Sequence, residues 1–349
     1  MSALLPTVPG GSREASDPTA GGRPPVAGAL RRHGAELVGR GWVAACRAGD
    51  AAAAAAHRIG AASVLPWPYE GQAAAEVVGV GTLGAVGDQA PVPIASLTKV
   101  MTAYVVLQSF PLAAGDAGPV IRIDRTAARE SESTIESVVP VREGQEFRLR
   151  QLMEFLLVPS GNNIARFLAR WCAGDEAEFV RRMNATAARL GMTRTRFTGS
   201  CGMDLGNVST ASDLLLLARA AMRDEVFRTV VGTPSVPLPS GQGLAHTTNR
   251  LLGQYGVVGL KTGTSTPAGG NVLWAAYVDT AGQRRLVLGA VLAQRAGRSP
   301  VRARAAVWAC TRRMVMALQR EAADGLPVVG PPLRAPEQAE PRPVPSGTL

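Results

Sequence analysis

The sequence PIASLTKVMTA, residues 93–103, contains the motif that points to the fold. In it Ser96 and Lys99 stand three positions apart. Apolar residues recur at helical spacing through this stretch and beyond it, which predicts a helix over residues 96–110. Side chains three positions apart lie on the same face of a helix, so the hydroxyl of Ser96 and the amine of Lys99 are expected to meet. The stretch therefore predicts a serine and a lysine side by side at the start of a helix.

A serine and a lysine in this arrangement can perform nucleophilic chemistry. The hydroxyl is a weak nucleophile until a neighbouring group takes its proton. A lysine amine can take that proton once burial or a second cation lowers its pKa from about 10.4. The helix start also directs backbone N–H groups and the positive end of the helix dipole at Ser96, where an oxyanion would form. By itself the Ser-x-x-Lys spacing is weak evidence, because a capped amphipathic helix produces it by chance.

The scarcity of lysine strengthens this interpretation. Of the 37 lysines and arginines among the 349 residues, only Lys99 and Lys261 are lysines. Arginine does not usefully lose its proton in proteins, whereas a buried lysine can. The two lysines are therefore the first candidates for chemistry in this chain.

Two further short motifs follow the Ser-x-x-Lys motif. SGN, residues 160–162, sits in a tight loop between two predicted helices, where it can present a hydroxyl and an amide together. KTG, residues 261–263, follows an apolar run, and a strand edge there can hold an extended substrate by backbone hydrogen bonds and its carboxylate by charge. Gly263 would let the substrate backbone approach closely. Alone, each motif is also explained by an ordinary turn, but the ordered triple includes every lysine of the chain and is a strong signal.

Other site chemistries have little support in the sequence. The four cysteines lie far apart without a Cys-x-x-Cys spacing, so no zinc site is expected. GVGTLG, residues 79–84, matches a dinucleotide-binding pattern, but no helix can follow it in the Gly- and Pro-rich stretch after it, so we predict a hairpin. The net charge of +10 suggests nucleic acid, yet no aromatic residues interleave the arginines of the last helix, and a solvated face is the better interpretation. Those arginines are Arg302, Arg304, Arg312, Arg313 and Arg320.

Composition divides the chain into three parts. Residues 1–61 are rich in Gly, Pro, Ala and Arg and are predicted to be a disordered or weakly ordered extension, and the Pro-rich residues 325–349 a disordered tail. Residues 62–324 form one predicted domain of the α+β class. No apolar run reaches the length of a membrane span, and no secretory signal is recognisable. Within the domain we expect strands near 75–80, 84–86, 256–261, 271–278 and 284–293, and helices over 96–110, 149–158, 163–172, 176–190, 212–223 and 301–320.

The three motifs resemble those of the penicillin-recognising serine enzymes, and within them those of the low-molecular-mass D-alanyl-D-alanine carboxypeptidases. Four further segments are similar to sequences of that branch: PIA before Ser96, EGQ at 143–145, LLVPSGN at 156–162 and STA at 209–211. The resemblance covers about residues 62–320. It implies a five-stranded antiparallel sheet flanked by helices, an all-helical subdomain, and an active site between the two.

The resemblance also implies roles for individual residues in catalysis. Ser96 would form the acyl-enzyme, Lys99 would accept its proton, and Ser160 would pass a proton to the leaving D-alanine. The backbone N–H groups of Ser96 and Thr264 would form the oxyanion hole. No metal or cofactor is implied.

Substrate binding is implied for the remaining motif residues. Asn162 would position the substrate amide, and Lys261 would hold the terminal carboxylate with the help of Thr262. The chain departs from many relatives at Asn163, where they have aspartate, and at Thr264, where they have histidine. These departures bear on rate and on fine substrate preference.

The implied function is removal of the terminal D-alanine from peptidoglycan stem peptides by a monomer in the extracytoplasmic cell envelope, with β-lactams as covalent inhibitors. The C-terminal β-rich domain and anchoring helix of many relatives have no room after Arg320. A D,D-endopeptidase or transpeptidase acting on the same bond class remains an alternative. A β-lactamase or esterase is disfavoured, since no Glu-x-x-x-Asn stretch lies between Ser160 and Lys261. A non-catalytic sensor that is acylated and stops is the alternative from a different functional class.

Overall fold

The structure, a computed structural model, describes residues 65–280, 282–322, 326 and 328–331. The predicted extension over residues 1–61 lies outside the described residues, and so does most of the predicted tail over 325–349.

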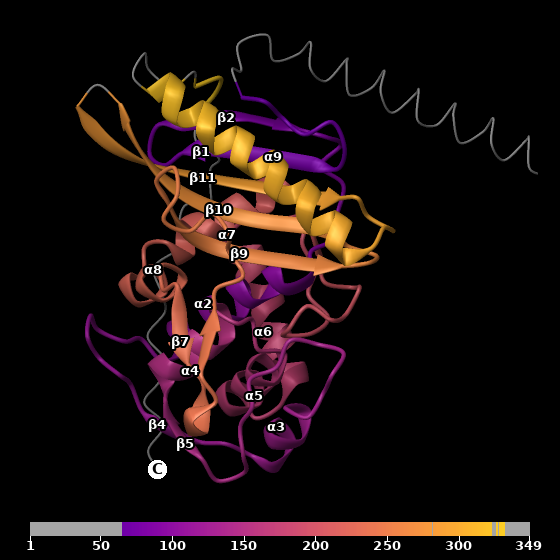
Figure 1. The fold of residues 1–349 in the computed structure, drawn as a ribbon, viewed down its shortest axis with the longest axis vertical. Helices are drawn as coiled ribbons and strands as arrows, with labels where there is room; N and C mark the ends of the chain where they lie inside the picture. The colour runs from indigo at the N-terminus through magenta and orange to yellow at the C-terminus, as the bar shows by residue number, and fades with distance from the viewer. Residues whose placement is uncertain (1–64, 281, 323–325, 327, 332–349) are drawn as a thin grey trace, which may run out of the picture. The chain divides into compact units, whose positions relative to one another are not determined.

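The central element is a five-stranded sheet with the strand order β2-β1-β11-β10-β9 (Figure 1), in which every neighbouring pair is antiparallel. The α+β prediction with a five-stranded antiparallel sheet is therefore confirmed. Residues 79–84 belong to the hairpin of the first two strands, as predicted. The strands are β1 (Gln72–Val77), β2 (Gly81–Val86), β9 (Val257–Ser265), β10 (Gly269–Thr280) and β11 (Gln283–Gln294).

Side chains of β10 pack alternately into two buried apolar clusters, which explains why both faces of this sheet are covered. Val272, Trp274 and Val278 belong to one buried apolar cluster, whereas Leu273 and Ala275 between them belong to the other. Successive side chains of a strand point to opposite faces, so a strand that is apolar at every position has to be buried on both. Trp274 faces Gly289 of β11 in the strand register, and a Cβ atom at that glycine would lie 2.1 Å from the indole ring.

Helices cover the two faces of the sheet. The long helix α9 (Pro300–Glu321) crosses one face, and it begins at Ser299, whose side chain accepts a hydrogen bond from the N–H of Arg302. Helix α7 (Ala211–Ala221) packs on the other face against β1 and β11, and the side chain of Thr210 caps its start by accepting a hydrogen bond from the N–H of Asp213. Beyond α7 lies the helical part of the domain (Figure 1). Its helices are α2 (Thr98–Ser109), α3 (Arg125–Glu130), α4 (Leu149–Leu157), α5 (Asn162–Ala173), α6 (Glu176–Arg189) and α8 (Glu225–Val231).

Several short elements were not predicted from the sequence. Helices α3 and α8 each have fewer than eight residues, too few for a periodic pattern to stand out. The small strand pairs are two or three residues long and leave no alternation to detect. They are β3 (Val92–Pro93) with β6 (Val208–Ser209), β4 (Val120–Arg122) with β5 (Glu146–Arg148), and β7 (Ser235–Pro237) with β8 (Leu244–His246); two single 3₁₀ turns are η1 (Ala95–Leu97) and η2 (Pro239–Gly241).

A short part of the predicted disordered tail runs along the edge of the sheet. The N–H of Val329 donates to the carbonyl of Thr82 at 2.9 Å, and the N–H of Thr82 donates to the carbonyl of Gly330 at 3.1 Å. Proline content predicted disorder here, but it carries no information about a free strand edge that can bind the segment. For residues 329–330 the tail prediction is therefore corrected.

Candidate active site

Ser96 lies in the 3₁₀ turn η1, immediately before α2. The helix was predicted to begin at Ser96 but begins at Thr98, because Ala95 has a φ of +48° and turns the chain just before the serine. Such a backbone conformation is costly for a residue with a side chain and is found at functional sites more than elsewhere. Ser96 is half-buried, whereas Lys99 in the first turn of α2 is fully buried.

The amine of Lys99 is the centre of a group of polar contacts. Its Nζ atom lies 3.0 Å from the Oγ of Ser96 and 2.7 Å from the carbonyl oxygen of Cys201, and it also contacts the Oδ1 of Asn162. The pKa of Lys99 is lowered from 10.5 to about 8, chiefly by burial; the charge of Arg166 also lowers it, whereas Cys201 and Glu136 act in the opposite direction. The predicted meeting of Ser96 and Lys99 is present, and near pH 8 the lysine can exist as the neutral amine that a base requires.

The SGN motif lies in the turn between α4 and α5. Ser160 has a φ of +68°, and its buried hydroxyl has no hydrogen-bond partner among the described residues. A buried hydroxyl without a partner is costly unless something else occupies the site. Asn162 opens α5 and joins Lys99 to the loop before β5, since its Nδ2 donates to the Oε2 of Glu136 at 2.8 Å and its N–H to the carbonyl of Ser137 at 2.8 Å.

The KTG motif lies on β9, which is one of the two edge strands of the sheet. Lys261 is only 1% exposed, and its Nζ donates to the carbonyl of Thr262 at 3.1 Å. No carboxylate of the described residues forms an ion pair with it. Burial, together with the charge of Lys99, lowers the pKa of Lys261 well below its usual value. A buried cation without a protein anion is arranged to receive one from a ligand.

The end of β9 differs from the prediction in its length. The strand was expected to end at Lys261 but continues to Ser265, and Thr264 pairs with Gly270 of β10. Gly263 makes room for the turn that carries the nucleophile, and its expected close approach to a substrate stays a prediction. A Cβ atom at Gly263 would lie 2.6 Å from the carbonyl oxygen of Ile94 and 2.9 Å from the nitrogen of Ser96.

Two threonines complete this side of the site. The Oγ1 of Thr262 donates to the Oγ1 of Thr248 at 2.7 Å, which fixes the rotamer of Thr262 next to Lys261. Thr264 is half-buried at the end of the strand.

Sequence reasoning missed Glu136, Arg166 and the carbonyl of Cys201. Arg166 stands four positions after Asn162, a spacing that places both on one face of α5 and could have been noticed. Glu136 lies in an irregular loop, and nothing in its local sequence distinguishes it from other acidic residues. The contribution of Cys201 is a backbone carbonyl, which no sequence pattern reveals.

Asn163 faces away from the amine of Lys99. Its Oδ1 accepts from the N–H of Val139 at 3.0 Å, and its Nδ2 donates to the carbonyl of Val139 at 2.8 Å and to that of Ala127 at 3.4 Å. Asn163 therefore fastens the loop that contains Glu136 to α5.

Metal chemistry is not offered by these side chains. Within the part of the chain that the structure describes, no group of three or more His, Cys, Asp or Glu side chains could hold a metal ion.

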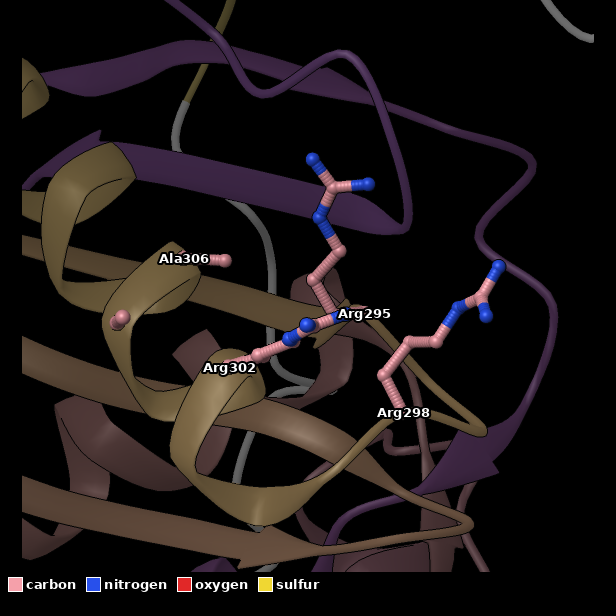
Figure 2. A pocket seen from close by; sticks show the side chains of 5 residues that line it. Arg295, Arg298, Arg302 and Ala306 are labelled. Atoms are coloured by element: carbon pink, nitrogen blue, oxygen red, sulfur yellow. The ribbon is translucent and has the colours of Figure 1, made fainter.

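A separate cavity of about 570 Å³ lies next to α9, with arginine side chains extending around it from the helix and from the loop before it (Figure 2). None of the predicted site residues lines this cavity. Its lining residues are Arg295, Arg298, Arg302, Ala305 and Ala306.

The arrangement around Ser96 can support acyl transfer. It combines a hydroxyl next to a buried amine of lowered pKa, a second hydroxyl at Ser160, and the amine of Lys261, which forms no ion pair with a carboxylate of the described residues. These are the parts that nucleophilic catalysis on a substrate with a free carboxylate requires.

Comparison with known proteins leads to the same chemistry. The D-alanyl-D-alanine carboxypeptidase family, Peptidase_S11, matches residues 83–293. The D-alanyl-D-alanine carboxypeptidase DacB2 of Mycobacterium tuberculosis is 36% identical over 202 residues, covering 56% of this chain and 65% of the relative. A D-alanyl-D-alanine endopeptidase of Pseudomonas aeruginosa is 38% identical over 130 residues, covering 37% of this chain and 40% of the relative. The chain thus spans less than two thirds of the length of these two relatives.

A solved structure shares the fold. The Streptomyces K15 DD-transpeptidase is similar with a TM-score of 0.58 and 27% identity, over 70% of this chain and 96% of that one. The family match covers more than half of the chain and includes Ser96, Lys99, the SGN motif and the KTG motif. The chain belongs to the D-alanyl-D-alanine carboxypeptidase family of serine peptidases.

Proposed function

We propose that this chain is a serine-type D-alanyl-D-alanine carboxypeptidase that removes the terminal D-alanine of peptidoglycan stem peptides. The observation that carries the proposal is the contact of the buried Lys99 amine with the Ser96 hydroxyl, because a fully buried lysine at 3.0 Å from a serine has little structural purpose. The buried cation at Lys261 supports a substrate that ends in a free carboxylate.

The proposed reaction proceeds through an acyl-enzyme. The neutral amine of Lys99 takes the proton of Ser96 as its Oγ attacks the carbonyl carbon of the scissile amide. The C–N bond breaks, and Ser160 passes a proton to the nitrogen of the leaving D-alanine. Water then attacks the ester, a proton returns to Ser96, and the shortened peptide acid leaves.

Substrate contacts are proposed for the remaining motif residues. Asn162 positions the substrate amide, and Lys261 with Thr262 holds the terminal carboxylate. The N–H groups of Ser96 and Thr264 bind the oxyanion. These groups sit on α5, β9 and η1, which are packed elements, so little reorganisation is needed when charge develops.

Location and inhibitors follow from the same proposal. Because peptidoglycan lies outside the cytoplasmic membrane, the enzyme would act in the extracytoplasmic envelope as a monomer, and β-lactams would acylate Ser96. Among the described residues, no helix is both long and apolar enough to span a membrane.

The test is to incubate the protein with an N-acylated L-Lys-D-Ala-D-Ala tripeptide and to measure released D-alanine. Ser96→Ala is the control and should release none. Mass analysis of the products separates the alternatives: a transpeptidase forms a longer product when an amine acceptor is added, and an endopeptidase prefers cross-linked peptides. A sensor would give one equivalent of D-alanine and a lasting acyl-enzyme. Lack of D-alanine release with all peptides would contradict the proposal.

A further inference from the structure

The amide of Asn162 has one donor end and one acceptor end, and the two ends face different partners. Its Nδ2 donates to the Oε2 of Glu136 at 2.8 Å, and its Oδ1 contacts the Nζ of Lys99. A carboxylate can only accept hydrogen bonds and a protonated amine can only donate them. Only one of the two orientations of the amide therefore satisfies both neighbours.

Glu136 is itself held in place by an arginine. Arg166 binds both carboxylate oxygens of Glu136, at 2.6 Å to Oε1 and 3.2 Å to Oε2. The two side chains are only 18% and 11% exposed, so this is a well-shielded bidentate pair. Arg166 also pairs with Glu130 at 3.2 Å, at the end of α3.

This pair belongs to a row of contacts along α5. Asn162, Arg166 and Arg170 are spaced by four residues and share one face of the helix. In the same order they bind Glu136, Glu130 and Asp124, the last by an ion pair of 3.1 Å. The row fastens α3 and the loop after it to α5.

We propose that Glu136 is a positioning residue that fixes the orientation of the Asn162 amide, so that Asn162 presents its oxygen to Lys99 and holds the amine beside Ser96. The inference deepens the proposed function and rests on it. Without Glu136 the amide can rotate and direct its Nδ2 at Lys99, and two donors would then face each other.

Glu136 does not serve as a base in this role. Burial raises its pKa, but the hydrogen bonds from Arg166 and Asn162 outweigh burial, and the pKa is lowered overall. It is therefore a carboxylate at neutral pH, with both oxygens occupied. Its influence reaches Ser96 through Asn162 and Lys99.

Two substitutions of Glu136 separate its effect on the orientation of the Asn162 amide from the effect of its negative charge. In Glu136→Gln the side-chain oxygen can still accept from Asn162 while the negative charge is lost, and in Glu136→Ala both are lost. The matched control is Glu130→Gln, which removes a carboxylate from the same arginine but does not touch Asn162. The measured quantity is the second-order rate constant of acylation by a fluorescent penicillin, from pH 6 to pH 10.

At the high-pH plateau, Glu136→Ala should lose about 10- to 100-fold in acylation rate, the effect expected for one hydrogen bond that involves a charged group. Glu136→Gln should retain most of the rate, and Glu130→Gln all of it. Because the charge of Glu136 raises the pKa of Lys99, the rising limb should move to lower pH in both Glu136 variants. The other groups that face Lys99, namely Arg166 of α5, Lys261 of β9 and the thiol of Cys201, are unchanged in all three variants.

A measurement that needs no enzymatic activity makes the test independent of the proposed function. With only two lysines in the chain, lysine labelled with ¹³C at Cε gives two signals, assigned by Lys261→Arg, and their titration reports the pKa of Lys99 directly. This pKa should fall in the order wild type, Glu136→Gln, Glu136→Ala, while Glu130→Gln matches the wild type.

Two results would overturn the inference. Equal plateau losses in Glu136→Gln and Glu136→Ala would show that charge alone matters. A lower melting temperature with an unchanged plateau and an unchanged Lys99 titration would show that Glu136 is only a structural ion pair. If the wild type formed no acyl-enzyme, the proposed function would fail, and the titration order would still decide whether Glu136 orients Asn162.

Discussion

The Nζ of Lys99 lies 3.0 Å from the Oγ of Ser96, and burial lowers the pKa of this amine to about 8. The hydrogen bond brings the base to its nucleophile, and burial makes the base available at a pH close to neutral. Both properties result from the position of Lys99 in the first turn of α2, beneath the loop of Cys201 and the start of α5.

The acylation rate should therefore rise with pH through a midpoint near 8, since only the neutral amine can accept the proton of Ser96. The measurement is penicillin labelling of Ser96 across pH, followed by intact mass. Lys99→Arg should abolish labelling at every pH, because arginine keeps its proton. If Lys99→Arg kept more than about a tenth of the rate, a different base would have to be sought.

Gly263→Ala should impair the site without removing any of its functional groups. The added methyl would lie within 3.0 Å of backbone atoms of Ile94, Ser96 and Leu97, so β9 and η1 would have to separate. We expect a large loss in acylation rate together with a lower melting temperature. Gly232→Ala is the matched control, since its Cβ would meet nothing closer than 3.2 Å and its φ is ordinary. Normal acylation by Gly263→Ala would show that the contact of β9 with η1 is not needed.

The parts of the fold that the sequence predicted are those with strong periodicity. Residues 272–278 of β10 and 286–293 of β11 form unbroken apolar runs, and α4 through α7 have clear apolar faces, so their positions agree with the prediction to within a few residues. The start of α2 was placed two residues early because the positive φ of Ala95 depends on its packing against β9 and the Gly202 turn. Local sequence does not encode such a contact.

The candidate site was predictable where a residue type is scarce or a motif is contiguous. Lys99 and Lys261 stood out because the chain has no other lysine. Glu136 could not be found, because its role depends on a loop that approaches Asn162 from 26 positions away. The packing of Gly263 against the backbone of Ser96 could not be predicted either, because it joins segments that are far apart in the sequence.

Asn163→Asp should destabilise the protein, although aspartate is the residue that the family resemblance implies at this position. The carboxylate would lose the donor that Asn163 gives to the carbonyl of Val139 and would face that oxygen in a buried position. We expect the free energy of unfolding to fall by about 1–3 kcal/mol at pH 8. Because burial would raise the pKa of the new carboxyl above its unfolded value, the loss should be smaller at pH 5, where the protonated acid can donate. Urea unfolding at the two pH values measures this.

The same substitution should also lower the acylation rate, since Asn163 fastens the loop that carries Glu136. Asn184→Asp is the control, because Asn184 makes similar bonds to the backbone of Val180 and Phe197 outside this loop. It should reduce stability but leave acylation intact. Equal acylation in both variants would mean that the loop does not depend on Asn163.

The last prediction concerns Lys261 and the substrate carboxylate. The buried amine forms no ion pair with a carboxylate of the described residues, and burial together with the charge of Lys99 holds the pKa of Lys261 well below its usual value. A bound carboxylate would favour the charged form and raise that pKa, so a peptide with a free C-terminal acid should bind with uptake of a proton. Calorimetry of an acid peptide with Ser96→Ala, in buffers of different ionisation enthalpy, measures the uptake. The peptide amide should show much less of it.

Substitutions of Lys261 test whether the proton uptake and the preference for peptides with a free C-terminal acid depend on the same amine. Lys261→Ala should lower the preference of kcat/KM for acid over amide peptides by roughly 10- to 150-fold, the range for a charge-assisted hydrogen bond. Lys261→Arg should retain part of the preference but bind the acid without proton uptake, because arginine is already charged. Equal losses for acid and amide peptides in Lys261→Ala would contradict carboxylate binding and would leave Lys261 a role in the fold or in the environment of Lys99.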